Sequence, residues 1–187
     1  MKKIIVAFMA VLTVGITSVN AQGKFFTRNG YIKFYSEATM ENIEAHNRQV
    51  TSFLDTETGE FAFSVLMKSF QFEKALMQEH FNENYVESDK YPKSTFKGKI
   101  SNPEVINYKK DGVYNVQVDG DLTIHGVTKK VSTDGTIEVN GGKIIAKSKF
   151  PVAVADYNIS IPAVVRDNIA KEVEVTVEMA YEPYKQQ

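Results

Sequence analysis

The chain has 187 residues, of which 43% are hydrophobic, with a formal net charge of −1 and no cysteine. This length suits one domain with a sizeable core. No strongly basic stretch is present, which argues against a nucleic-acid partner. Without cysteine no disulfide can form, so the fold must depend on its hydrophobic core.

The first 21 residues have the pattern of a secretory signal peptide. Two lysines precede an apolar run at residues 4–16, and Val19-Asn20-Ala21 fits a small-residue cleavage site. The run is shorter than the roughly 20 residues of a membrane span, although an uncleaved N-terminal anchor stays open as an alternative. We expect residues 1–21 to be removed and residues 22–187 to form one domain, periplasmic or secreted. With no cysteine at the cleavage point, lipoprotein anchoring is ruled out.

Most of the mature chain alternates between apolar and polar residues, which is the period of a β-strand with one dry face. Glycine-containing turns separate some of these runs, and His125-Gly126 and Asn140-Gly141-Gly142 predict tight hairpins. The alternation predicts strands at Gly30–Ser36, Phe61–Met67, Phe96–Ile100, Tyr114–Ile124, Val127–Thr133, Ile144–Phe150 and Val173–Tyr181.

One segment has a helical period instead. From Phe72 onward, apolar positions recur at intervals of three and four as far as Tyr85. This pattern predicts one amphipathic helix of about three turns, inserted around residues 72–86. Regular strand spacing with a single helix indicates an all-β barrel or sandwich. Gly98 and Gly120 lie on apolar strand faces and suggest unfilled interior space, although a strand glycine more often marks a bulge or bend.

Three segments carry a resemblance to a known family. GDLTIHGVTKKV (Gly120–Val131) resembles the G-x-L-T-[IL]-H-G-V-T-K hairpin of the YceI-like family of lipid- or polyisoprenoid-binding proteins. The stretches His80–Ile100 and Asp156–Pro162 are similar to two further elements of that family, and the resemblance extends from about Phe25 to Tyr181. The region Met40–Asp55 departs from the family pattern, so the chain resembles a divergent member.

The resemblance implies an extended antiparallel eight-stranded lipocalin-like β-barrel with an apolar tunnel for an isoprenoid or another lipid. Apolar and aromatic linings suit a long hydrocarbon, although each such residue could equally fill a closed core. Tyr157, Asn158, Lys93 and Lys97 are candidate head-group contacts. The predicted lining residues are Phe61, Phe63, Val65, Phe72, Leu76, Phe81, Tyr85, Phe96, Val118, Leu122, Ile124, Tyr157 and Ile159.

Metal binding and catalysis find little support in the sequence. His46, His80 and His125 lack the spacing of a metal site, and we expect His125 to hydrogen-bond within its hairpin. No nucleophile, zinc or phosphate-loop motif is present, so we expect no catalytic residue and no cofactor.

The predicted function is an exported protein that sequesters or carries a long-chain apolar or amphiphilic ligand. Transient membrane contact stays open, and so does the oligomeric state, with a homodimer among the alternatives. A structural module with a filled barrel remains an alternative. A weaker one is an enzyme acting on a lipid-like substrate, which would need an inward His80 or Tyr157 paired with a carboxylate.

Overall fold

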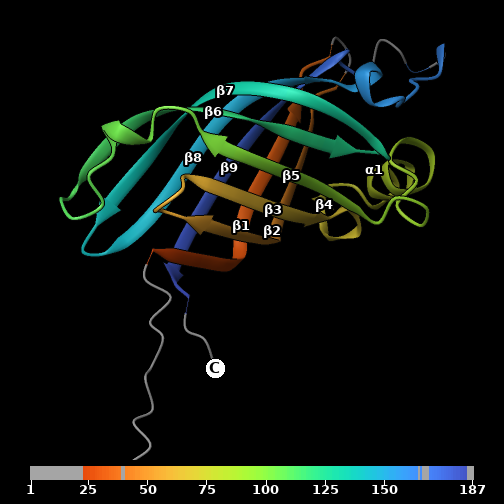
Figure 1. Ribbon diagram of the computed structural model, residues 1–187. Helices are drawn as coiled ribbons and strands as arrows, with labels where there is room; N and C mark the ends of the chain where they lie inside the picture. Colours follow the sequence, from red (N-terminus) through yellow and green to blue (C-terminus); the bar gives the residue numbers. More distant parts are fainter. Residues whose placement is uncertain (1–22, 39–40, 164, 166–168, 185–187) are drawn as a thin grey trace, which may run out of the picture.

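The computed structural model describes residues 23–38, 41–163, 165 and 169–184. The predicted signal peptide lies outside these residues. Within them, eight long antiparallel strands form one closed barrel, as predicted (Figure 1). The strands are β1 (Lys24–Ser36), β2 (Ile43–Asp55), β3 (Glu60–Leu66), β5 (Lys93–Ile100), β6 (Gly112–Ile124), β7 (Val127–Asn140), β8 (Lys143–Ala153) and β9 (Glu172–Pro183).

The barrel closes because β1 pairs with both β9 and β2. Around the wall the strands follow the order β1-β9-β8-β7-β6-β5-β3-β2. An additional two-residue strand, β4 (Gln71–Phe72), pairs with β2. A barrel of eight strands is wide enough either to fill with its own side chains or to hold one small ligand.

Both predicted hairpin turns are confirmed. His125 and Gly126 connect β6 to β7 with φ angles of 50° and 75°. Gly141 and Gly142 connect β7 to β8 with φ angles of 56° and 80°. Positive φ at both central residues is the signature of the type I′ turn, whose twist matches that of the flanking strands.

The strand β2 is absent from the sequence prediction because two of its inward positions are polar. Asn47 and Ser52 are almost fully buried among Ala45, Val50 and Leu54. The Asn47 side chain donates to the Leu66 carbonyl at 2.9 Å and accepts the Gln49 N–H at 2.9 Å. These bonds satisfy a buried amide. The two polar residues, however, interrupt the alternation of apolar and polar residues by which the other strands were predicted.

The observed helix is shorter than the predicted one, which covered residues 72–86, and it begins later. An α-helix, α1 (Ala75–His80), continues into a π-helical turn, η2 (Phe81–Tyr85), giving 11 helical residues. Phe72 belongs to β4, where it pairs with Ala45 of β2. Its ring packs on Phe81, with 5.0 Å between ring centroids. Phe72 lies four residues before Leu76, and both border the same cavity, so it matches the helical period although its backbone is extended.

Short helical turns among the described residues include η1 (Met67–Ser69), η3 (Pro103–Val105) and η4 (Val154–Tyr157). In Figure 1, α1 and the segment that follows β8 lie at one end of the barrel, and the loop between β5 and β6 lies at the other. We call the first of these the helix end.

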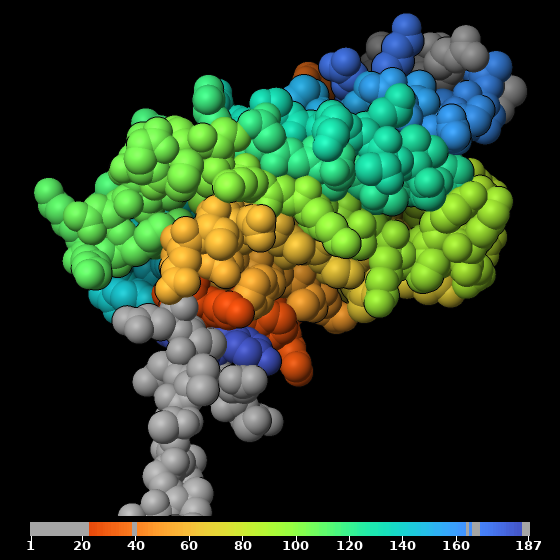
Figure 2. Space-filling model, in the orientation of Figure 1, coloured from red at the N-terminus to blue at the C-terminus, as the bar shows by residue number. Residues whose placement is uncertain are grey.

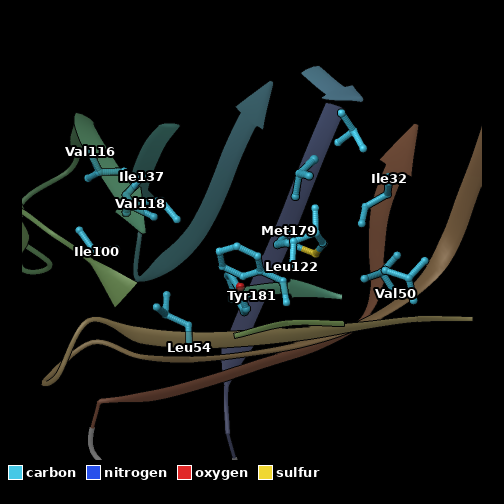
Figure 3. Packing of buried hydrophobic residues seen from close by; sticks show 14 of the residues in the cluster. Ile32, Val50, Leu54, Ile100, Val116, Val118, Leu122, Ile137, Met179 and Tyr181 are labelled. Atoms are coloured by element: carbon cyan, nitrogen blue, oxygen red, sulfur yellow. The ribbon is translucent and has the colours of Figure 1, made fainter. Parts of the chain in front are cut away.

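The half of the interior farther from α1 is filled by side chains. Leu54, Ile100 and Ile137 pack there around Tyr181 (Figure 3). Ser52 Oγ donates to the Ala62 carbonyl at 3.0 Å, so the Tyr181 hydroxyl donates to Ser52 Oγ, at 2.6 Å. This half therefore contributes stability and offers little space.

The space expected at Gly98 and Gly120 is occupied. These glycines pair across β5 and β6, and the ring of Phe96 lies directly over both of them. Phe96 itself is only 3% exposed. The glycines therefore make room for an aromatic ring of the same sheet and not for a ligand.

Candidate functional site

The helix end of the barrel encloses a cavity of about 560 Å³. Residues of every long strand except β7 line its walls, together with Phe72 of β4, and it is covered by α1, η2 and the segment following β8. In Figure 2 the helical segment and the segment after β8 lie at this same end of the molecule. Leu76 of α1 borders the cavity and is 60% exposed, so the cavity reaches the surface beside the helix.

All thirteen predicted lining residues border interior space, but in two places. Ten of them surround the large cavity: Phe63, Val65, Phe72, Leu76, Phe81, Tyr85, Leu122, Ile124, Tyr157 and Ile159. Phe61, Phe96 and Val118 instead border a second cavity of about 60 Å³, deeper in the barrel. For all thirteen residues, contact with a ligand stays a prediction.

A cluster of four phenylalanines lines the large cavity beside α1. Phe34 of β1 lies 5.5 Å from Phe70 and 5.5 Å from Phe81, measured between ring centroids. Phe72 lies 5.8 Å from Phe34 and 5.0 Å from Phe81. These edge-on, tilted and stacked rings join the helical cover to the barrel wall.

Phe34 and Phe70 were missing from the predicted lining. Phe34 lies on the apolar face of a predicted strand, so alternation carried the signal, but alternation alone does not identify which strand faces the cavity.

Other lining residues were missed for two different reasons. Val173, Val175 and Val177 line the cavity from β9, and their alternation predicted the strand but not its position against the cavity. Ile161 and Ile169 also line it, yet they lie between β8 and β9 where no periodic pattern marks them. Only the three-dimensional path of that segment brings them to the cavity.

Few polar groups face this cavity. Buried Ser94 donates to the Met67 sulfur at 3.0 Å, and buried Ser36 accepts the Ala170 N–H at 2.9 Å. Burial raises the pKa of Tyr85, and it raises that of Tyr157 together with the charge of Asp156. Both phenols therefore remain uncharged at neutral pH.

Charged groups occur at the rim. Glu41, which follows β1, forms an ion pair with Lys74 at the start of α1, and both border the cavity. Glu41 is the sole carboxylate among the described lining residues. Because Glu41 is paired with Lys74, the described lining offers no carboxylate partner to His80 or Tyr157. An acid–base enzyme would need such a partner.

Of the four predicted head-group contacts, only Tyr157 borders the cavity. Lys93 and Lys97 are exposed on β5 and lie outside the lining. Asn158 occupies the left-handed region, with a φ of 56°, where it ends η4. The three were proposed from sequence proximity to the family-like segments, which does not determine the direction of a side chain.

His125 connects three segments beside the cavity, and the expectation that it bonds within its hairpin is wrong. Its Nε2 lies 2.6 Å from Glu87 Oε2, and its Nδ1 lies 3.1 Å from the Tyr157 carbonyl. The ring also packs edge-on against Tyr91 at 4.5 Å. The hairpin is thus joined to the chain after η2 and to η4, both of which help enclose the cavity.

Two further features of the described residues bear on function. No group of three or more His, Asp or Glu side chains there is arranged to hold a metal ion. Among the described helices, none has the length and apolar character needed to cross a membrane.

Comparisons with solved structures find the same fold at low sequence identity. A polyisoprenoid binding domain from Saccharophagus degradans matches with a TM-score of 0.75 at 16% identity, covering 87% of this chain and 99% of that one. BcnA from Burkholderia cenocepacia matches with a TM-score of 0.67 at 17% identity, covering 82% and 96%. A YCEI protein from Campylobacter jejuni matches with a TM-score of 0.59 at 17% identity, covering 80% and 90%.

No curated protein sequence matches the chain significantly. The model of the YceI-like domain, however, matches residues 6–181. Because this match spans most of the chain, and because the barrel has the architecture of solved relatives, the protein belongs to the YceI-like family.

Proposed function

We propose that this protein is an exported, non-catalytic binding protein that holds one long apolar or amphiphilic chain in the cavity at the helix end. The observation that carries the proposal is the cavity itself: about 560 Å³, bordered mainly by apolar side chains and reaching the surface at Leu76. Ligand pockets commonly measure about 300–1,000 Å³ and are lined mainly by apolar groups. This volume argues against the alternative of a filled barrel.

The class of ligand follows from the lining and from one relative. A chain with few polar atoms is compatible with walls that offer few hydrogen-bond partners. The Saccharophagus degradans relative is named a polyisoprenoid binding domain, which supports an isoprenoid or a comparable lipid here. The paired Glu41 leaves no free carboxylate in the described lining, which supports sequestration over catalysis.

The expected affinity is moderate. Roughly 20 heavy atoms at about 0.3 kcal/mol each give about −6 kcal/mol, or tens of micromolar. A chain leaving a bilayer gains little from the hydrophobic effect, because it was already out of water. Packing against the aromatic rings must therefore compensate for the lost lipid contacts.

The predicted signal peptide supports a periplasmic or secreted location for the mature protein. Exposed Leu76 beside the cavity is the natural point of transient membrane contact, because a chain entering there would leave the bilayer next to an apolar side chain. The cavity lies within one copy of the chain, so ligand binding requires no particular oligomeric state.

Thermal unfolding of delipidated protein tests the proposal. A bound chain stabilises the folded state by mass action, so a straight-chain alcohol of roughly 16–20 carbons should raise Tm. Val175→Phe, which places a ring into the cavity from β9, should reduce that rise. Glu174→Gln, at the neighbouring outward position, should preserve it. If no chain raises the Tm of the wild-type protein, the proposal is wrong.

A further inference from the structure

We infer that Phe63, Phe150 and Val177 form a floor across the barrel that limits the held chain to roughly 20 carbons. This inference rests on the proposed function and adds to it a length class for the ligand and the residues that determine it.

The position of the floor follows from the two cavities. Phe63, Phe150 and Val177 are the only described residues that border both the 560 Å³ cavity and the 60 Å³ cavity beyond it. Phe63 comes from β3, whereas Phe150 and Val177 come from the neighbouring strands β8 and β9. In the closed order of eight strands, β3 and β8 are four strands apart. The floor is therefore built from opposite walls and blocks the barrel where its two halves meet.

Phe63 is held in place by an aromatic stack. Its ring is nearly parallel to that of Phe96, with 5.0 Å between centroids and 13° between planes. Phe61 stacks on Phe96 as well, at 5.4 Å. Phe96 rests on the two paired glycines, Gly98 and Gly120, and has no space behind it. Because the supporting ring cannot retreat, Phe63 cannot swing into the wall to admit a longer chain.

The length limit follows from the volume above the floor. A cavity of about 150 Å³ in another protein accommodates benzene, which corresponds to about 25 Å³ per carbon. On this scale, the 560 Å³ cavity accommodates roughly 20 carbons. Removing the Phe63 ring would vacate the space of its ring carbons and join the 60 Å³ cavity, giving room for roughly eight more.

A chain-length competition tests this assignment. Delipidated protein is incubated with phosphatidylcholine vesicles containing equal amounts of straight-chain alcohols from about 12 to about 28 carbons. The protein is then separated from the vesicles and its bound alcohols are extracted and identified by mass spectrometry. Wild type should retain chains up to roughly 20 carbons, and Phe63→Ala should raise this upper limit by roughly eight carbons. Chains near 26 carbons should be retained at least tenfold more by the variant.

Phe61→Ala is the matched control. It removes the same ring from the same strand and the same stack on Phe96, but Phe61 borders only the smaller cavity. Phe96 keeps its position against Gly98 and Gly120 without Phe61, so the length limit of this variant should stay that of wild type. Val177→Phe should shorten the limit by raising the floor from the opposite wall, and this variant keeps the test informative should Phe63→Ala fold poorly.

The outcomes separate the two proposals. A shift with Phe63→Ala or Val177→Phe but not with Phe61→Ala supports the floor. Equal length profiles in wild type and both floor variants overturn it and leave the proposed function intact. Retention of no alcohol by any of the proteins overturns the proposed function as well.

Discussion

Gly120 should be replaceable by alanine only at a substantial cost in stability. A methyl group at this position would lie 2.6 Å from the Lys97 carbonyl oxygen, 2.7 Å from Gly98 Cα and against the ring of Phe96. The ring could move, but two of these three neighbours are backbone atoms of the adjacent strand. Relief therefore requires a shift of β5 relative to β6.

The magnitude combines two opposing effects. Overpacking of this kind typically costs about 1–3 kcal/mol, and the strand shift places Gly120→Ala at or above the middle of that range. Glycine loses more conformational entropy on folding than alanine, which offsets about 0.5–1 kcal/mol. The net loss should be about 1–2 kcal/mol. For a chain of 187 residues this lowers Tm by roughly 2–8 °C.

Thermal and urea unfolding of Gly120→Ala and Gly112→Ala provide a matched comparison. Gly112 lies on the same strand, and a methyl group there would meet its nearest atom, in Tyr114, at 3.5 Å. That is ordinary contact, so Gly112→Ala should be neutral or slightly stabilising. If Gly120→Ala were as stable as Gly112→Ala, the close approach of β5, β6 and the Phe96 ring would be refuted.

Three other substitutions test separate parts of the structure. Phe34→Ala should cost about 1–3 kcal/mol in urea unfolding, less than a fully enclosed phenylalanine, because one side of the ring faces the cavity; a loss above that range would mean that the cavity is filled. Burial raises the pKa of Tyr181 to about 12. Between pH 10 and 12 the unfolded chain therefore binds fewer protons at this residue, so Tyr181 alone should lower the free energy of unfolding by about 2 kcal/mol as pH rises. Tyr181→Phe should flatten this fall in pH-dependent denaturation, and an unchanged profile would contradict the assignment. In His125→Asn, the asparagine tolerates the left-handed backbone, but its side chain is too short to bond both Glu87 and Tyr157. It should cost about 1–2 kcal/mol and speed proteolysis near residues 87 and 157, whereas wild-type behaviour would show that these contacts are dispensable.

Local sequence patterns predicted the strands whose inward face is uniformly apolar. β6 and β9 were found this way, and His125-Gly126 supplied the backbone chemistry of a hairpin between β6 and β7. β2 escaped because buried Asn47 and Ser52 are satisfied by partners on or next to β3. Their bonding depends on strands pairing, which a one-dimensional pattern does not contain.

The sequence predicted which residues lie inside the barrel better than it predicted which of the two cavities each one borders. Phe63 and Phe96 were both predicted as lining residues, but only the register of β3 on β5 shows that Phe63 borders the large cavity while stacking on Phe96 behind it. Gly98 and Gly120 suggested open space, whereas their pairing across two strands provides a seat for Phe96. Long-range register thus determines which interior residues line a cavity and which fill it.

Native mass spectrometry of freshly purified mature protein, never exposed to detergent, tests the central claim most directly. The account predicts a mass excess of one ligand per chain that organic extraction recovers as an isoprenoid or other long-chain lipid. Val175→Phe should reduce that excess, and Glu174→Gln should not. A bare protein mass for the wild type, with no lipid in the extract, would contradict the claim that the cavity holds a chain.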